Sequence, residues 1–238
     1  MRIVTWNCRA GYLKKKKNEL IEDLKPTIAV IQEAAPEGFD IWHGHYNKAG
    51  KAPKGIGIKC FDKDVSIRVC EKFLSDNRYF IPIILNTKQC TIKIVAVWAM
   101  GDERGEDGKT TQRGYRFRMH RMLDEMSDFI DERTIILGDF NSSVYFDYKY
   151  RSHKDKNFSA WNQRMTQFGF VSSLHEKLGV SLDESTLNTY FHNNHQAYCI
   201  DYAYMHKSML EEQGVKSVIT DERFRVVSDH IPLIIDFK

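Results

Sequence analysis

Several short apolar runs in this sequence end abruptly in a carboxylate or amide side chain. One run ends at Asn7, a second at Glu33 and a third at Asp139, with Asn141 two residues later. Because layered α/β folds place their sites beyond the ends of strands, we expect these side chains to converge. Carboxylates and amides without cysteine ligands suit Mg²⁺ or Mn²⁺ rather than zinc. The implied chemistry is hydrolysis of a phosphoryl or phosphodiester group.

A further polar cluster, Ser228-Asp229-His230, precedes the last apolar run. Each motif taken alone has an ordinary structural explanation. A strand that ends in Glu is common, and a Gly-Asp-Phe-Asn segment is more often a turn with Asx hydrogen bonds than a catalytic site. The order of the motifs along the whole chain is therefore what argues for a site.

In order and spacing, the motifs resemble those of one family, the endonuclease/exonuclease/phosphatase superfamily, which includes deoxyribonuclease I, exonuclease III, abasic-site endonucleases and sphingomyelinases. The matching segments are Thr5-Trp6-Asn7, Ile31-Gln32-Glu33, Gly138-Asp139-Phe140-Asn141, Ile200-Asp201-Tyr202 and Ser228-Asp229-His230. They run from residue 5 to residue 230, so the resemblance covers essentially the whole chain. It implies an α/β fold, a four-layer α/β/β/α sandwich of two mixed β-sheets flanked by helices, and a metal-dependent phosphodiester hydrolase.

The resemblance also implies a set of metal ligands. Glu33 would be the principal carboxylate on Mg²⁺ or Mn²⁺, with Asn7 beside it and Asp229 on the metal or its water network. Magnesium keeps several waters and takes only one or two carboxylates, which suits this sparse set.

Four matched residues would act on the substrate together with Asn7. Asp139 resembles the general base that takes a proton from the attacking water, and Asn141 resembles the amide that contacts a phosphate oxygen and positions that base. His230 resembles the imidazolium that stabilises the pentacovalent phosphorane, and Asp201 resembles the carboxylate that orients and charges it. An Asp–His pairing raises the pKa of the imidazole, so a cationic donor is available at neutral pH.

Two positions depart from the abasic-site nucleases of this family. Arg9 stands two residues after the first Asn, where that branch has an acidic residue, so a phosphate clamp replaces a metal ligand, as in the deoxyribonuclease I branch. Trp98 stands where the family often has Tyr or His, and we expect it to be a core or pocket-wall aromatic.

The elements that must position these residues alternate along the chain. Apolar runs predict strands over residues 2–6, 28–31, 57–61, 65–69, 80–85, 91–98, 134–137, 200–205 and 231–237. Helical periodicity predicts three amphipathic helices: one with Leu13, Leu20, Ile21 and Leu24 that ends at Pro26; one from Met119 to Ile130; and one with Trp161, Met165 and Phe168 that stops at Gly169. The run Lys14 to Lys17 is expected on a solvated helix face.

The length of 238 residues gives room for a sizeable core, and no repeat, linker or shift in composition marks a boundary. We therefore expect a single domain over residues 1–238, acting as a monomer. Five scattered cysteines form no disulfide or zinc pattern, and neither a signal peptide nor a membrane span is visible, which favours a cytoplasmic protein away from membranes.

The substrate class is less sharply indicated. Residues 145–156 interleave aromatic and cationic side chains beside Asp139 and Asn141, as a phosphate track with stacking platforms would. From it we select Lys149 and Arg151 as phosphate contacts, with Arg9 and Arg116 as further candidates. Residues 101–114 are expected to form a mobile loop on the same rim.

Three functions stay open on the sequence. The favoured one is a nuclease or DNA-repair phosphodiesterase with nucleic acid, DNA first, as its substrate. The second is a small-molecule, lipid or inositol phosphoesterase on the same fold. The third, a non-catalytic binding module, is disfavoured because every expected polar residue is present.

Overall fold

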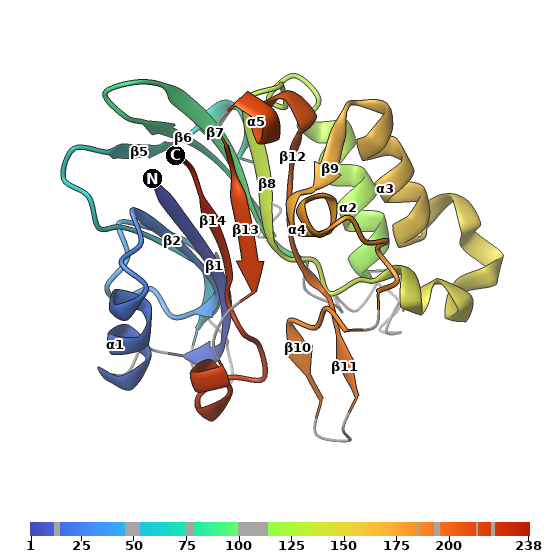
Figure 1. Ribbon diagram of the computed structural model, residues 1–238, viewed down its shortest axis with the longest axis horizontal. Helices are drawn as coiled ribbons and strands as arrows, with labels where there is room; N and C mark the ends of the chain where they lie inside the picture. Colours follow the sequence, from blue (N-terminus) through green and yellow to red (C-terminus); the bar gives the residue numbers. More distant parts are fainter. Residues whose placement is uncertain are drawn as a thin grey trace.

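Two six-stranded β-sheets pack face to face in the computed structural model, with helices on their outer sides (Figure 1). The structure describes residues 1–11, 15–45, 53–74, 79–99, 114–184, 186–192, 196–212, 214–219 and 222–238. Among these, no helix is long and apolar enough to cross a membrane.

The first sheet has the order β13-β14-β1-β2-β4-β3. Its strands are β13 (Lys216–Ile219), β14 (Leu233–Asp236), β1 (Arg2–Gly11), β2 (Ile28–Ala34), β4 (Lys54–Cys60) and β3 (Ile41–His45). The pair β1–β2 is parallel and the other pairs are antiparallel, so the sheet is mixed.

The second sheet has the order β5-β6-β7-β8-β12-β9. Its strands are β5 (Ser66–Val69), β6 (Phe80–Asn86), β7 (Thr91–Trp98), β8 (Thr134–Asp139), β12 (Asp201–His206) and β9 (Phe170–Ser172). Here β7 and β8 are parallel, and the other pairs are antiparallel. A separate hairpin pairs β10 (Tyr190–Phe191) with β11 (Ala197–Tyr198).

The helices are short. They are α1 (Lys15–Asp23), α2 (Gly114–Glu125), α3 (Phe158–Gln167), α4 (Ser173–Leu178) and α5 (Lys207–Glu212), with 3₁₀ segments η1 (Glu71–Phe73), η2 (Val144–Lys156) and η3 (Glu222–Val226).

Three apolar clusters define four layers. The first joins the two sheets, since it combines Ile3 and Val30 of one sheet with Ile94 and Leu137 of the other. The second packs α2 and α3 on the outer face of the β7–β8 sheet, and the third packs α1 and η3 on the outer face of the β1–β2 sheet. The predicted four-layer α/β/β/α sandwich is therefore confirmed.

Every strand predicted from the sequence has a counterpart; β7 matches the predicted residues 91–98 at both ends, and the others differ at one end or both. The last one begins at Leu233 rather than Ile231, because Ile231 still belongs to the segment that turns into the sheet. The short strands β3, β9, β10, β11 and β13 were not predicted. They lie at sheet edges or in the hairpin, where tertiary pairing rather than an apolar run defines a strand.

Several helix predictions need correction. The segment Val144–Lys156, to which the sequence assigned no helix, is 3₁₀-helical, and α2 ends at Glu125, short of Ile130. Phe168 is 61% exposed instead of packed, because α3 ends at Gln167 and the chain turns at Gly169, where φ is 80°. Leu13, Lys14 and residues 101–113 lie outside the described residues.

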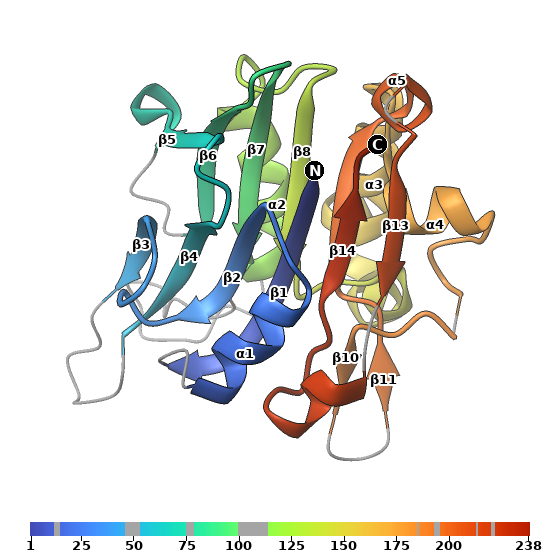
Figure 2. The ribbon, with the colours of Figure 1, turned by 60° about the vertical axis from the view of Figure 1, so that its left-hand side comes forward.

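The ends of the central strands meet at one edge of the molecule, the lower edge of Figure 1. There β1 ends past Asn7 and the parallel β2 ends past Glu33, while β8 ends at Asp139 and the antiparallel β12 begins at Asp201. The chain enters β14 at the same edge just after His230, and the β10–β11 hairpin hangs beside it (Figure 2).

Candidate active site

Asp139, at the end of β8, lies at the centre of this edge and is fully buried. Its Oδ1 accepts a hydrogen bond from the backbone N–H of Asn141 at 2.8 Å, and its Oδ2 accepts from the side-chain amides of Asn7 and Asn141, both at 2.9 Å. The preceding Gly138 has φ of 141°, and a Cβ there would lie 2.0 Å from the carbonyl oxygen of Val97. Only glycine lets β8 approach β7 this closely, so Gly138 sets the position of the carboxylate.

Asp201 and His230 form a buried pair next to Asp139. Asp201 lies opposite Asp139 in the β8–β12 register, and its Oδ2 lies 2.9 Å from Nδ1 of His230. The hydroxyl of Thr189 accepts hydrogen bonds from the backbone N–H groups of Ile200 and Asp201, which holds the start of β12 in place. Within the described residues, Oδ1 of Asp201 is buried without a hydrogen-bond partner.

His230 is fixed from three sides. Its backbone N–H donates to the Ser228 hydroxyl, which in turn donates to the carbonyl of Asn7 at 2.8 Å. The indole N–H of Trp6 donates to the carbonyl of His230, and the Tyr190 ring lies 4.8 Å from the imidazole between ring centres. These contacts attach the segment before β14 to β1, so the position of the His230 imidazole relative to Asn7 is fixed.

The surroundings of this cluster raise the pKa values of both Asp139 and His230. Burial, together with the nearby Asp201 carboxylate, raises the pKa of Asp139 to about 7, although the His230 charge and the Asn7 amide oppose the shift. Burial alone would lower the pKa of His230, but the charge and hydrogen bond of Asp201 outweigh it and raise the pKa to about 9. At neutral pH the imidazole is therefore an imidazolium beside a carboxylate that can still exchange its proton.

Glu33 lies on the other side of Asn7 and is partly exposed. It adopts φ of 57°, where β1 and β2 lose their regular register. Its Oε1 lies 3.5 Å from the Asn7 amide nitrogen, and its Oε2 lies 2.5 Å from Nζ of Lys54. Asn7 thus links Glu33 to Asp139, because one amide group faces both carboxylates.

The donor set fits a hard divalent cation. Glu33 offers carboxylate oxygens to solvent, and the side chain of Asp229 is 26% exposed at the same edge, as Mg²⁺ or Mn²⁺ would require. In the part of the chain that the structure describes, the cluster with metal-ligand spacing is a different one, namely Asp139, Asp201 and His230, whose ligand atoms lie within 4.8 Å of one another. In that cluster the His230 imidazolium already balances a carboxylate, whereas Glu33 is partly exposed and offers its oxygens to a hydrated cation.

The other two predicted cation ligands, Asn7 and Asp229, already contact protein groups. The Asn7 amide oxygen accepts the backbone N–H of Arg9 at 2.9 Å, and its nitrogen faces the carboxylates, so Asn7 acts here as a donor. Asp229 lies 3.6 Å from the guanidinium of Arg9, whose side chain is 57% exposed. The cation-binding roles of Asn7 and Asp229 stay predictions.

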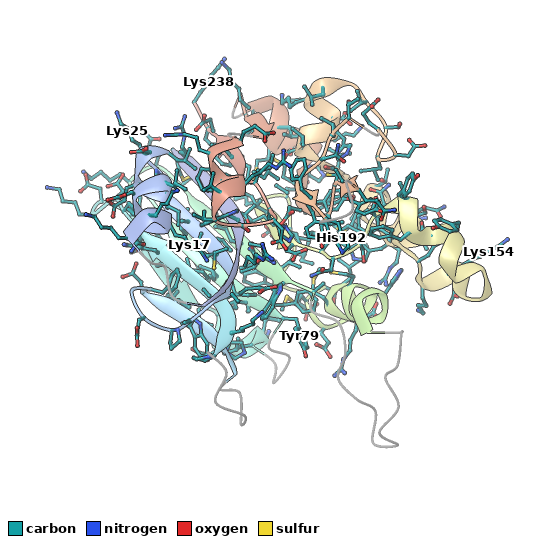
Figure 3. The ribbon with its side chains drawn as sticks, turned by 90° about the horizontal axis from the view of Figure 1, so that it is seen from below. Lys17, Lys25, Tyr79, Lys154, His192 and Lys238 are labelled. Atoms are coloured by element: carbon teal, nitrogen blue, oxygen red, sulfur yellow. The ribbon has the colours of Figure 1, made fainter. Side chains whose placement is uncertain are left out.

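Of the remaining predicted residues, Trp98 has a described side chain and three cationic residues do not. Trp98 pairs with Asp139 across β7 and β8 and is buried in the core between the sheets, as an aromatic wall residue would be. Arg116 lies in α2, and Lys149 and Arg151 lie in η2, but their side chains are outside the described residues. Figure 3 shows the same edge from below, with Lys154 at the outer end of η2, well away from His192 in the middle.

Sequence reasoning missed the partners of the site. Lys54 has no motif around it, and Thr189 and Tyr190 come from the hairpin that the apolar pattern did not reveal. Lys17, expected in solvent, is buried, and its ammonium donates to the carbonyls of Cys8 and Ala10. The positive φ values of Arg9 and Ala10, 53° and 58°, bring those carbonyls together, and no sequence signal shows this.

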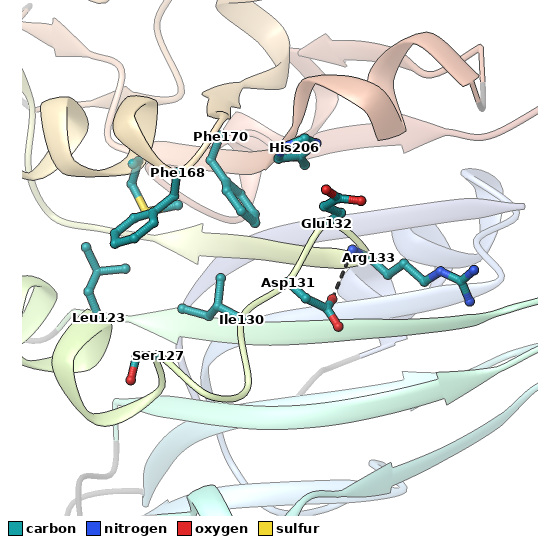
Figure 4. Close-up of a pocket in the computed structure, with 10 residues that line it drawn as sticks. Leu123, Ser127, Ile130, Asp131, Glu132, Arg133, Phe168, Phe170 and His206 are labelled. Carbon is teal, nitrogen blue, oxygen red and sulfur yellow. Dashed lines mark hydrogen bonds between the residues drawn. The ribbon is translucent and has the colours of Figure 1, made fainter.

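A large pocket of about 470 Å³ lies elsewhere. It opens between the ends of α2 and α3 and is lined by Leu123, Phe168, Phe170 and His206, with Asp131 to Arg133 on its rim (Figure 4). Asp131 and Arg133 precede β8, whereas Asp139 ends it, so the pocket lies at the opposite end of the sheet. It is not part of the candidate site.

Among known proteins, similarity to this chain is found in solved structures and not in sequences. No protein-family model matches the chain, and no curated protein matches its sequence. Among solved structures, the endonuclease domain of TRAS1, a telomere-specific non-LTR retrotransposon, is similar with a TM-score of 0.67 at 16% identity over 100% of this chain and 97% of that one.

Two further structures are similar over almost their whole lengths. An AP endonuclease from Archaeoglobus fulgidus has a TM-score of 0.64 at 16% identity, covering 100% of this chain and 99% of that chain. The 3' phosphatase NExo from Neisseria, bound to product DNA hairpin, has a TM-score of 0.62 at 18% identity with the same coverage. At such identities the likeness establishes the fold.

Proposed function

We propose that this chain, whose fold is that of the endonuclease/exonuclease/phosphatase superfamily, is a divalent-cation-dependent phosphodiesterase that hydrolyses nucleic acid. The observation that carries the proposal is the buried Asp139 carboxylate. It is held by two asparagine amides, next to an Asp201–His230 pair and at the same edge as Glu33. Such a set provides a base, a cationic donor and a cation ligand in one place.

The cation, Mg²⁺ or Mn²⁺, would supply positive charge to the scissile phosphate and its leaving oxygen. Glu33 would hold it, with Asp229 and Asn7 near it or its waters. The partial exposure of Glu33 leaves room for the several waters that Mg²⁺ retains.

Asp139 acts as the general base that takes the proton of the attacking water. An ionised carboxylate offers about four acceptor positions, of which the amides of Asn7 and Asn141 occupy three. One position is left for the water, and the three amide contacts fix the carboxylate so that the water is oriented. A pKa raised to about 7 makes Asp139 a stronger base than an ordinary aspartate.

His230 acts as the donor to the phosphate oxygens. Its Nδ1 is bound to Asp201, so Nε2 carries the proton that can face the developing negative charge. The pKa of about 9 keeps that proton in place at neutral pH. Preorganised donors of this kind stabilise charge that appears only in the transition state.

Nucleic acid, and DNA first, is the favoured substrate. Arg9 is exposed beside Asp229 and can clamp a phosphate, and the cation-rich η2 segment with Lys149 and Arg151 follows Asn141 directly. Arg116 is a further candidate on α2. The similar structures include an AP endonuclease and a 3' phosphatase bound to a product DNA hairpin, which supports a polynucleotide over a small phosphodiester as the substrate.

We further infer one domain over residues 1–238 that works as a monomer in the cytoplasm. The core shared by both sheets supports the single domain. The odd number of cysteines, all free in the structure, supports a reducing compartment.

The function is tested with a hydrolysis panel of plasmid, abasic-site duplex, single-stranded DNA, RNA and bis(p-nitrophenyl) phosphate, each with Mg²⁺, Mn²⁺ or EDTA. Glu33→Ala and Asp139→Asn should each lower the rate by about 10²–10⁴ or more. Asp64→Asn, at an exposed ion pair with Lys88, is the matched control and should keep the rate.

Two results would count against the proposal. Full activity in EDTA would show that hydrolysis does not depend on a divalent cation. Hydrolysis of the small phosphodiester with no cleavage of any polynucleotide would instead assign the chain to small-molecule, lipid or inositol phosphoesters.

A further inference from the structure

Lys54 is the one cation that contacts Glu33 in the part of the chain that the structure describes. Lys54 begins β4, and its Nζ lies 2.5 Å from Oε2 of Glu33 in β2. The side chains are 37% and 23% exposed, so the pair is half-buried and faces the edge where the substrate must arrive.

The backbone of Lys54 is closely packed. Its neighbour Gly55 is paired with Ala34 in β2 and with Gly44 in β3. A Cβ on Gly55 would lie 2.4 Å from the carbonyl oxygen of His43, and one on Gly44 would lie 2.4 Å from the carbonyl oxygen of Lys54. Because no side chain separates β3 from β4 at Gly44 and Gly55, the start of β4 is held against β3, and the Gly55–Ala34 pair places it next to Glu33. The flexible lysine stem is the part that can move.

Both oxygens of Glu33 therefore have a donor. Asn7 lies on the Oε1 side and Lys54 on the Oε2 side. A divalent cation that binds Glu33 must share the carboxylate with the ammonium or displace it, since two cations within a few ångströms of each other repel. The four-carbon stem lets the ammonium swing away from the carboxylate while its backbone stays in place.

We infer that Lys54 neutralises Glu33 before the cation binds, and that the cation displaces the Lys54 ammonium toward the substrate phosphate. The inference rests on the proposed function, because it takes Glu33 as the cation ligand. Lys54 then has two opposed effects. It weakens cation binding to the free enzyme, and it strengthens substrate binding to the loaded enzyme.

The first effect is measured by titrating Mn²⁺ into the protein without substrate, by calorimetry or by electron paramagnetic resonance of free Mn²⁺. Lys54→Met should bind Mn²⁺ about fivefold more tightly, the size expected for removing one partly exposed ion pair. Lys54→Arg keeps the charge and should bind as the wild type does. Lys88→Met, which breaks an exposed ion pair with Asp64, is the matched control and should leave the affinity unchanged.

The second effect is measured at saturating Mn²⁺. Lys54→Met should raise KM for the polynucleotide about fivefold, with a smaller change in kcat, whereas a purely structural role would lower the amount of folded protein and leave KM unchanged. Circular dichroism of each variant, with Lys54→Gln as a second neutral replacement, separates misfolding from the effect on binding.

Glu33→Gln separates failure of this inference from failure of the proposed function. If Glu33→Gln abolishes Mn²⁺ binding but Lys54→Met leaves it unchanged or weaker, the role of Lys54 is wrong and the cation ligand stands. If Mn²⁺ binds equally well to Glu33→Gln, both are overturned.

Discussion

The two ionisable groups at the centre of the site set the pH range in which the proposed reaction can run. Asp139, with a pKa raised to about 7, must lose its proton, and His230, with a pKa raised to about 9, must keep its own. Hydrolysis should therefore rise as the pH passes about 7 and fall as it passes about 9. Asp201→Asn removes the negative charge that raises the His230 pKa, so the falling limb should move to lower pH. The pH profiles of kcat/KM measure both limbs, and a falling limb that stays in place would contradict the pairing.

Asp201 and His230 should also act as one unit. In the proposed reaction Asp201 mainly orients and charges His230, which it contacts at 2.9 Å, and it adds to the raised pKa of Asp139 less than burial does. His230→Ala alone should remove the donor, and adding Asp201→Asn should then lower the rate little further. Single-turnover rates of the two single variants and the double variant give the comparison. Fully additive losses would mean that the two residues act independently.

At the scale of elements, α1 supports the turn that carries Asn7 and Arg9. The buried Lys17 ammonium donates to the carbonyls of Cys8 and Ala10, the residues before and after Arg9. Arg9 and Ala10 both have positive φ. Lys17→Met leaves these carbonyls without a charged donor and should cost about 1–3 kcal/mol of unfolding free energy. Urea unfolding measures the loss.

The same helix offers a control for this prediction. Lys15 pairs with Glu19 at 3.8 Å and is 91% exposed, so Lys15→Met should change the free energy of unfolding by less than about 0.5 kcal/mol. Equal losses from Lys15→Met and Lys17→Met would show that burial of Lys17 does not stabilise the turn.

At the scale of the molecule, cation-rich segments beside the site should set how salt affects DNA binding. If Lys149 and Arg151 each contact a phosphate, replacing both with Ala should lower the slope of log K against log salt by about 0.9 for each lost contact on duplex DNA. Fluorescence anisotropy at several salt concentrations measures the slope, and hydrolysis of a small phosphodiester should not change.

Lys63 and Lys88 provide the control for that experiment. Both lie near the turns at the far end of the sheets, so Lys63→Ala with Lys88→Ala should leave the slope unchanged. An unaltered slope and affinity in the Lys149 and Arg151 variant would retire the nucleic-acid role of these residues and favour the small-molecule alternative.

The shared core predicts how the whole chain unfolds. Ile3 and Val30 from one sheet pack with Ile94 and Leu137 from the other, so neither sheet keeps its buried face if the other unfolds. Thermal unfolding should be one transition with coincident circular dichroism and tryptophan fluorescence curves, and with equal calorimetric and van't Hoff enthalpies. Two separated transitions would divide the chain into more than one domain.

Much of the fold and site could be predicted from local patterns. Apolar runs indicated the longer strands, and the helical spacing of Leu20, Ile21 and Leu24 indicated α1 because one face of that helix is buried. The polar residues that follow those runs are the ones now found at one edge, since strands in a layered sheet end together. Local order along the chain was enough to predict Asn7, Glu33 and Asp139 as neighbours.

What the sequence did not determine are the contacts made between distant segments. Glu33 meets Lys54 because β2 and β4 pair in one particular register, and Lys17 is buried because β1 bends at Arg9. A lysine carries no local signal that says whether it will lie in solvent or against a carboxylate. That choice depends on strand register and packing across the sheets, which only the tertiary structure decided.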